Sequence, residues 1–290
     1  MTVEDATPPD ITPPDITAEQ IHTVDDSDFH AGHCCLVTGA GSGIGQATAL
    51  ALAANGLTVV ASDIDEDGLL ETGEKAAELN TIGTVQTVTA DLTEDDDIER
   101  LVEEAAGYGD IKYLANIAGL QHIDTIEAFP MDVYDTIHDV MVRAPLYLSK
   151  LCLPHIRDTD DGRGAIGNMA SVHGHYVTAE KVGYNVSKFA IRGLTRSIAA
   201  EGNGEVRSFS ISTGYVATPL VTEQIPDTAE SRNLSPQEVV GDVMLGQART
   251  KELMHPVDVA NLFVLGFSKL SRHLNGGDLL FDGGMTHTYE

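Results

Sequence analysis

The feature that most constrains the fold of this 290-residue chain is an alternation, from His33 onward, of short apolar runs with longer stretches of helical periodicity. Such alternation indicates βαβ units, which build a parallel sheet with right-handed crossovers. We expect strands near residues 34–38, 58–62, 85–90, 113–117, 165–170, 207–212 and 278–281, and helices near 44–55, 69–79, 95–106, 133–157, 182–201 and 256–268. The predicted fold class is therefore α/β, a doubly wound parallel sheet of about seven strands in one domain over residues 31–290.

Two segments fall outside this alternation. Residues 1–30 contain the sequence Thr-Pro-Pro-Asp-Ile twice, at 7–11 and 12–16, with eight acidic residues and no Lys or Arg. Paired prolines fix φ and remove hydrogen-bond donors, so we expect a flexible acidic tail, with a partner-docking motif as the alternative. Residues 218–250 have no strand character, and we call them the lid segment because we expect them to cover a cleft.

The chain is strongly acidic, with 45 Asp and Glu against 17 Lys and Arg and a formal net charge of −28. A nucleic-acid partner or an anionic membrane surface would need a basic footprint, which this composition lacks. Residues 31–290 still carry 37 acids against 17 bases, so the acidity belongs to the folded body. An ordinary acidic enzyme is one explanation. We favour a halophilic protein, since the Debye length falls to about 3 Å in molar salt and self-repulsion weakens.

The chain shows no signal of export, membrane insertion or metal binding. No charged segment followed by an apolar one opens it, and no apolar run is as long as a membrane span. The three cysteines, Cys34, Cys35 and Cys152, are too few for a disulfide framework and are expected as buried thiols. We therefore expect a cytoplasmic protein without a metal.

A glycine-rich turn lies between the first predicted strand and the first predicted helix. Glycines let the backbone approach a pyrophosphate closely, and the helix N-terminus offers free N–H groups and a positive dipole end. This context predicts a Rossmann-like dinucleotide site. Its candidate residues are Thr38, Gly39, Ser42, Gly43, Ile44 and Gly45.

Asp63 ends the second predicted strand, 18 residues after Gly45. A carboxylate there accepts hydrogen bonds from ribose hydroxyls and repels a 2′-phosphate. No Arg or Lys lies between Thr38 and Glu74 to hold that phosphate. The cofactor is therefore predicted to be NAD, although a solvated surface carboxylate is the alternative for Asp63.

Three further residues suggest acid–base chemistry. Ser171 follows the fifth predicted strand, and Tyr184 and Lys188 share one face at the start of the next helix. A tyrosine with its ordinary pKa is a poor base at neutral pH, and a neighbouring ammonium should lower that pKa. We predict that Tyr184 is the general acid/base and that Ser171 holds the substrate oxygen.

These motifs together resemble the short-chain dehydrogenase/reductase family over essentially all of residues 33–284. The resemblance implies an NAD-binding Rossmann-like domain and the same three catalytic residues. It also implies a homotetramer. Further cofactor contacts implied by the resemblance are Asp91 and Leu92 at the adenine, Asn116, Ala118 and Gly119 at the nicotinamide ribose, Tyr184 and Lys188, and Gly214, Val216 and Thr218 near the carboxamide.

The chain departs from the family at its fourth catalytic position, where an Asn is usual and Met141 stands here. In the family this position helps to hold a water that relays protons to the lysine. Pro145 has no N–H for the Met141 carbonyl, so we hypothesise that this carbonyl is free to bind the relay water. The alternative is a methionine that fills the core beside a kink.

Four polar residues flank the catalytic elements: Gln121, His173, Lys181 and Gln224. They could converge on a small carboxylate. These segments resemble those of D-3-hydroxybutyrate dehydrogenases, which implies reversible oxidation of (R)-3-hydroxybutyrate to acetoacetate. Two alternatives stay open: another short-chain enzyme, such as a 3-oxoacyl reductase or a polyol dehydrogenase, or a catalytically silent NAD-binding protein.

Overall fold

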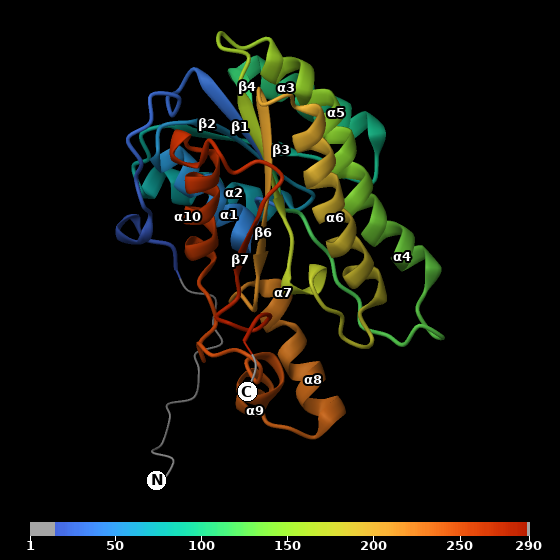
Figure 1. Cartoon of the computed structure of the whole chain (residues 1–290). Helices are drawn as coiled ribbons and strands as arrows, with labels where there is room; N and C mark the ends of the chain where they lie inside the picture. The colour runs from blue at the N-terminus through green and yellow to red at the C-terminus, as the bar shows by residue number, and fades with distance from the viewer. Residues whose placement is uncertain (1–14, 289–290) are drawn as a thin grey trace.

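A parallel seven-stranded sheet forms the centre of the structure, a computed structural model that describes residues 15–288 apart from the side chains of residues 227 and 231. The strand order is β3-β2-β1-β4-β5-β6-β7. Figure 1 shows the sheet between its helices. The strands are β1 (His33–Thr38), β2 (Thr58–Asp63), β3 (Thr84–Thr89), β4 (Asp110–Asn116), β5 (Gly164–Met169), β6 (Val206–Thr213) and β7 (Asp278–Phe281). The order reverses between β1 and β4, and such a switch point is where open α/β sheets bind ligands.

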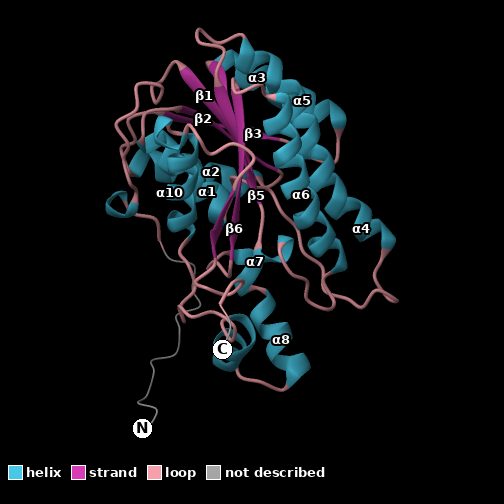
Figure 2. Cartoon of the chain, in the orientation of Figure 1, coloured by secondary structure: helices cyan, strands magenta, loops and turns pink. Residues whose placement is uncertain are grey.

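Helices cover both faces of the sheet (Figure 2). One face packs on α1 (Gly43–Ala54), α2 (Glu66–Glu78) and α10 (Pro256–Phe267), and the other on α3 (Asp95–Tyr108), α5 (Ala144–Arg157) and α6 (Val182–Glu201). Each face has its own apolar core, because strands buried on both sides carry apolar residues in both directions. The predicted doubly wound α/β fold is confirmed.

The parallel register brings the carboxyl ends of the strands to one edge. Thr38 pairs with Ser62 across β1 and β2, and Asn116 pairs with Asn168 across β4 and β5. The loops that follow these strands therefore meet at one edge of the sheet. The lid segment lies beyond this edge and contains α7 (Pro219–Thr222), α8 (Gln224–Arg232), α9 (Pro236–Glu238) and the π-helical turn η4 (Val239–Met244).

The long helix predicted at 133–157 is divided into two α-helices. A π-helical turn, η2 (Asp139–Arg143), separates α4 (Met131–His138) from α5, and the Ala144 N–H donates to the Asp139 carbonyl. Pro145 follows directly and cannot donate, so the ladder is interrupted at this point. Proline in a helical pattern signalled the kink, but the change of helix type could not be read from it.

Residues 15–30 differ from the tail predicted for 1–30, because they pack on the folded body. Ile21 and Phe29 are buried, and the His22 N–H donates to Asn261 Oδ1 at 2.9 Å. The repeated Thr-Pro-Pro-Asp-Ile motif lies mostly outside the described residues. The acidic residues of this segment are not a solvated tail, because they contact two lysines.

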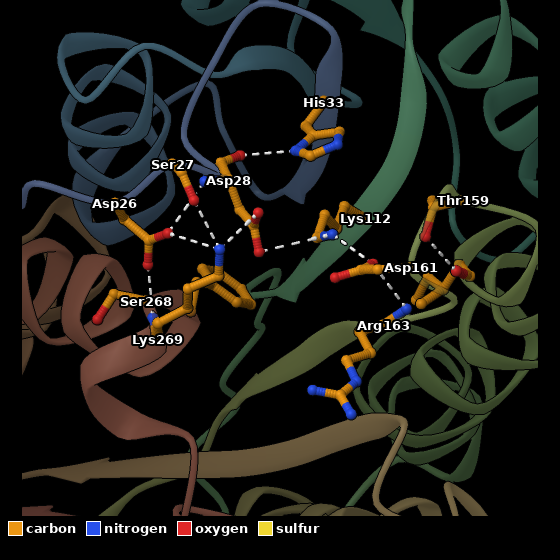
Figure 3. A network of polar contacts seen from close by, with 12 residues as sticks. Asp26, Ser27, Asp28, His33, Lys112, Thr159, Asp161, Arg163, Ser268 and Lys269 are labelled. Carbon is orange, nitrogen blue, oxygen red and sulfur yellow. Dashed lines mark hydrogen bonds and ion pairs between the residues drawn. The ribbon is translucent and has the colours of Figure 1, made fainter.

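Asp26 and Asp28 reach the lysines at the amino ends of the strands (Figure 3). Lys269 Nζ lies 2.8 Å from Asp28 Oδ1, and the nearly fully buried Lys112 lies 2.7 Å from Asp161 and 3.6 Å from Asp28. This network ties the N-terminal segment to β4 and to the turn after α10, at the edge of the sheet opposite the lid segment.

All three cysteines are buried and free, as predicted. Among the described residues, no helix is both long and apolar enough to cross a membrane. That part of the chain also has no group of three or more His, Cys, Asp or Glu side chains arranged to hold a metal ion.

Candidate active site

A cavity of about 550 Å³ opens at the carboxyl ends of the strands. It lies where the sheet order reverses, between the glycine-rich turn and the start of the lid segment. Most of the predicted site residues line it: Gly39, Ser42, Gly43, Ile44, Gly45, Asp63, Asp91, Leu92, Ala118, Gly119, Ser171, Tyr184, Lys188, Gly214, Val216 and Thr218. The fold therefore brings predicted cofactor and catalytic residues into one cavity.

The glycine-rich turn has a shape that only glycine permits. Gly39 has φ +68° and Gly43 has φ +52°, and a Cβ on Gly45 would lie 1.9 Å from the Gly39 carbonyl oxygen. Helix α1 begins at Gly43, so its first N–H groups point toward the cavity without a side-chain cap. This cradle fits the pyrophosphate of a dinucleotide.

Thr38 does not line the cavity. Its hydroxyl accepts hydrogen bonds from the backbone N–H groups of Ile117 at 3.0 Å and Ala118 at 3.3 Å. It therefore joins the glycine-rich turn to the loop after β4. The structure shows a positioning role for Thr38, and its predicted cofactor contact stays a prediction.

Two carboxylates lie at the predicted adenosine end. Asp63 Oδ2 accepts from the Gly41 N–H at 2.9 Å, and Asp63 Oδ1 accepts from the Asp65 N–H at 3.1 Å. Asp91 Oδ1 accepts from the backbone and hydroxyl of Thr93. Both carboxylates are held in place by neighbouring donors and retain lone pairs for a ligand.

Asn116 is buried and does not line the cavity, and its predicted place at the nicotinamide ribose stays a prediction. Its side-chain NH₂ donates to Asn168 Oδ1 at 2.9 Å, and Asn168 in turn donates to Thr195. These amides link the ends of β4 and β5 to α6. Of the residues predicted at the nicotinamide ribose, Ala118 and Gly119 line the cavity, together with their neighbours Ile117 and Leu120.

Ser171, Tyr184 and Lys188 form the chemical centre of the cavity. Ser171 follows β5, and the first turns of α6 place Tyr184 and Lys188 on one face. Ser171 hydrogen-bonds the Tyr184 phenol, and Lys188 Nζ lies 5.3 Å from the centre of the Tyr184 ring. Lys188 Nζ also donates to the Met169 carbonyl at 2.8 Å, which fixes its direction.

The pKa of Tyr184 differs from our prediction. Burial raises it to about 12, although the hydrogen bond from Ser171 lowers it. Burial also lowers the pKa of Lys188 to about 7, so this lysine is a weaker cation than we assumed. At neutral pH the phenol is therefore protonated and ready to act as an acid, while Lys188 can gain or lose a proton.

His173 and Lys181 lie beside this centre but do not line the cavity. His173 Nδ1 is 3.4 Å from the Ser171 hydroxyl, and the centre of its ring is 5.6 Å from that of Tyr184. Burial and the charges of Lys181 and Lys188 lower the pKa of His173 to about 4, so its imidazole is neutral. Burial lowers the pKa of Lys181 to about 8, and the charge of Arg232 adds to that effect.

The two predicted glutamines bind each other. Gln121 Nε2 donates to Gln224 Oε1 at 2.5 Å, and Gln224 also donates to the Leu220 carbonyl. This contact joins the loop after β4 to the start of α8. The structure thus brings two of the four predicted substrate residues together, and none of the four lines the cavity.

A known protein family matches most of the chain. The family model described as short chain dehydrogenase matches residues 33–229. The chain belongs to this family. The D-beta-hydroxybutyrate dehydrogenase of Rhizobium meliloti is 33% identical over 254 residues, which cover 87% of this chain and 97% of that protein.

Other short-chain dehydrogenases are nearly as similar. The D-beta-hydroxybutyrate dehydrogenase of Cupriavidus necator is 31% identical, covering 87% of this chain and 97% of its own. The 3-oxoacyl-[acyl-carrier-protein] reductase of Thermotoga maritima is 30% identical, covering 88% and 98%. A crystal structure from Beutenbergia cavernae with NADP bound at low occupancy has a TM-score of 0.79 and 26% identity, covering 90% of this chain and all of that one.

Met141 of this short-chain dehydrogenase packs in the core next to the active site. It is 3% exposed, and its sulfur accepts from the Leu120 N–H at 3.3 Å and lies 3.8 Å from Ser187 Oγ. Its neighbours Asp139 and Val140 line the cavity, but Met141 does not. The side chain is therefore core filler in contact with α6, while the role of its carbonyl stays a prediction.

Two tyrosines were not singled out from the sequence, one near Lys181 and one near His173. Tyr215 and Tyr176 belong to the apolar cluster that joins the lid segment to the body. Lys181 Nζ lies 6.0 Å from the centre of the Tyr215 ring, and the His173 ring lies 5.5 Å from that of Tyr176. Tyr215 could have been found, because it follows β6 at the carboxyl edge; Tyr176 carries no such signal.

Proposed function

We propose that this short-chain dehydrogenase catalyses the reversible, NAD-dependent oxidation of (R)-3-hydroxybutyrate to acetoacetate. The observation that carries the proposal is Lys181. Among the described residues, its half-buried ammonium has no carboxylate within ion-pair distance, in a chain with 45 acids. An unpaired cation that has lost part of its hydration favours an anionic ligand.

The position of Lys181 sets the expected size of the ligand. Lys181 directly precedes α6, and its charge lowers the pKa of His173. The Nδ1 atom of His173 lies beside the Ser171 hydroxyl. A short acid can therefore place its carboxylate at Lys181 and its hydroxyl at Ser171 and Tyr184. Similarity to two D-beta-hydroxybutyrate dehydrogenases supports the same substrate.

The chemistry follows from the geometry of these side chains. The bound cofactor would accept the hydride that leaves C3. In reduction the protonated Tyr184 gives its phenolic proton to the substrate oxygen. In oxidation Tyr184 takes the hydroxyl proton as its own proton leaves toward the neutral form of Lys188, while Ser171 holds the same oxygen by a hydrogen bond. Lys188, with a pKa near neutrality, passes the proton onward from Tyr184.

We infer that NAD is preferred over NADP. Asp63 lines the cavity just after β2, and its carboxylate is fixed by the Gly41 and Asp65 N–H groups. A fixed carboxylate can accept from both ribose hydroxyls and would repel a 2′-phosphate. Lys75, the first cation after Asp63, is already bound to Glu71 and Gln46.

The proposal is tested by NADH formation from a panel of substrates, measured at low salt and in molar KCl. The panel contains 3-hydroxybutyrate, its amide, a 3-hydroxyacyl thioester and a polyol. We expect the free acid to have the highest kcat/KM, and Lys181→Ala to raise the KM for the acid alone. A preference for the thioester would replace the proposal with the 3-oxoacyl reductase activity of the Thermotoga relative.

A further inference from the structure

Two nitrogens of His173 face the hydroxyl of Ser171. Ser171 caps η3 (Val172–Gly174), the short 3-10 turn after β5, because its Oγ accepts from the His173 N–H at 3.2 Å. His173 Nδ1 lies 3.4 Å from the same oxygen. This contact is longer than a usual hydrogen bond, as catalytic contacts often are before a substrate binds. If Nδ1 donates as well, both lone pairs of Oγ are occupied, and the hydroxyl proton is left for a ligand in the cavity that Ser171 lines.

The far nitrogen of the His173 ring contacts Thr178. Nε2 lies 3.0 Å from Thr178 Oγ1. Thr178 stands in the loop before α6, and its carbonyl accepts from Asn185 Nδ2 at 2.8 Å, which ties that loop to the helix. His173 is only 4% exposed, and the centre of its ring lies 5.6 Å from that of Tyr184. A buried ring therefore joins the Thr178 hydroxyl to the Ser171 hydroxyl.

Only one of the two ring nitrogens of His173 carries a proton. Burial, together with the charges of two lysines, lowers the pKa of His173 to about 4, so the imidazole is neutral. The hydrogen bond made by one nitrogen decides which of the two is protonated. With the proton on Nε2, Nδ1 can only accept, and it competes with the substrate for the Ser171 proton. With the proton on Nδ1, Ser171 keeps its proton for the substrate, and Nε2 needs a donor.

We propose that Thr178 is a positioning residue that supplies this donor. The Thr178 hydroxyl donates to His173 Nε2 and so holds the ring proton on Nδ1, which donates to Ser171 Oγ. Ser171 then directs its one proton to the substrate oxygen, where the charge changes during hydride transfer. This inference rests on the proposed function for the role of Ser171, but it does not depend on the identity of the substrate.

The kinetic experiment compares the wild type with Thr178→Val, Thr178→Ser, Ser171→Ala and the double variant Ser171→Ala/Thr178→Val. It uses the best substrate of the panel above, and a high enzyme concentration for the slow variants. Thr81→Val is the matched control, because it removes a hydroxyl that donates to the Gly83 carbonyl at 3.0 Å in the turn before β3. Far-ultraviolet circular dichroism and the melting temperature show whether each variant is folded.

We expect Thr178→Val to lower kcat about 3- to 10-fold, which is the effect of one lost hydrogen bond. The KM for the substrate and the dissociation constant for NADH should change less than about twofold, because the Ser171 proton matters most in the transition state. Thr178→Ser keeps the hydroxyl and should restore kcat to within about twofold of the wild-type value. In the Ser171→Ala background, Thr178→Val should have no further effect, because Thr178 acts through Ser171.

Nitrogen-15 NMR of the protein labelled at histidine reads the tautomer of His173 without turnover. The variant His173→Gln identifies the signals of His173 by their absence. We expect the proton on Nδ1 in the wild type and in Thr178→Ser. In Thr178→Val the signals should shift toward the tautomer with the proton on Nε2, because Nε2 has lost its donor.

Four results would overturn the inference. These are a proton on His173 Nε2 in the wild type, an unchanged kcat in Thr178→Val, an equal loss from Thr178→Val with and without Ser171, and a similar loss of kcat in Thr81→Val. A failure of the proposed function is recognised separately, because the wild type would then prefer another substrate of the panel or oxidise none. The same comparison is made with the preferred substrate. Without any turnover the NMR signals decide: a proton on Nδ1 that moves in Thr178→Val supports the inference, and a proton on Nε2 overturns it.

Discussion

Replacing Asp63 with asparagine should lower the proposed preference for NAD over NADP. The wild-type carboxylate accepts from the Gly41 N–H at 2.9 Å and from the Asp65 N–H at 3.1 Å, and it lines the cavity. Asparagine retains one acceptor oxygen, so it can keep the Gly41 contact and the shape of the glycine-rich turn. The substitution therefore removes the charge with little change in the cradle.

The expected magnitude has two parts. For NAD, a charge-assisted hydrogen bond becomes a neutral one, which costs about 1–2 kcal/mol, or roughly 5- to 30-fold in KM. For NADP, two unit charges 4 Å apart repel by about 4 kcal/mol at an effective dielectric constant of 20. Asp63 is half-exposed, so screening leaves about 1–2 kcal/mol of this repulsion, again roughly 5- to 30-fold. Together these effects should lower the NAD/NADP ratio of kcat/KM by about 30- to 1000-fold.

The assay measures kcat/KM for both cofactors at a saturating concentration of the hydroxy acid, in the wild type and in Asp63→Asn. Asp65→Asn is a control, because its exposed side chain carries the same charge two residues away. A ratio that changes less than threefold in Asp63→Asn would refute our assignment of Asp63. A similar change in Asp65→Asn would show that general charge, and not a contact with the ribose, sets the preference.

Three further perturbations test other parts of the structure. Tyr184→Phe should lower kcat by about 10²- to 10⁴-fold. The dissociation constant for NADH, measured by the fluorescence of NADH, should stay within about threefold of the wild-type value. Substantial residual turnover would exclude Tyr184 as the acid/base. The pKa of Lys181 is about 8, so the ammonium is charged below that pH. The KM for the hydroxy acid should therefore rise as the pH increases through this value. A flat KM profile from pH 7 to 9 would contradict the role of Lys181 in binding the carboxylate. Lys112→Met leaves Asp28 and the half-exposed Asp161 without their buried cation. Calorimetry should therefore show a free energy of unfolding lower by about 1–2 kcal/mol and a melting temperature lower by about 2–8 °C. Turnover should persist in Lys112→Met, and an unchanged melting temperature would show that the network in Figure 3 contributes no stability.

Much of the site could be predicted because it depends on local sequence. The glycine-rich turn needs backbone conformations that only glycine permits, and Gly39, Gly43 and Gly45 occupy those positions. Tyr184 and Lys188 share a helix face by spacing alone. Parallel strands then bring the ends of β1, β2, β4 and β5 to one edge, which assembles the cavity from segments far apart in the chain.

Other parts of the site depend on burial and could not be predicted. The sequence shows Lys188 beside Tyr184, which suggested a lowered phenol pKa. In the structure, desolvation raises the pKa of Tyr184 to about 12 and lowers that of Lys188 to about 7. Asn116 and the pair Gln121–Gln224 were also placed by long-range contacts, because each amide binds another amide from a distant element.

From the sequence alone we predicted the order of strands and helices, the parallel sheet and the chemical groups at its carboxyl edge. Periodicity and backbone sterics act over a few residues, so they can be read along the chain. Three features emerged only from the fold: residues 15–30 pack on the body, η2 interrupts the helix before α5, and Gln121 meets Gln224. These features depend on contacts between groups that are far apart in the sequence. Such groups lose water and pair with one another only when the chain folds.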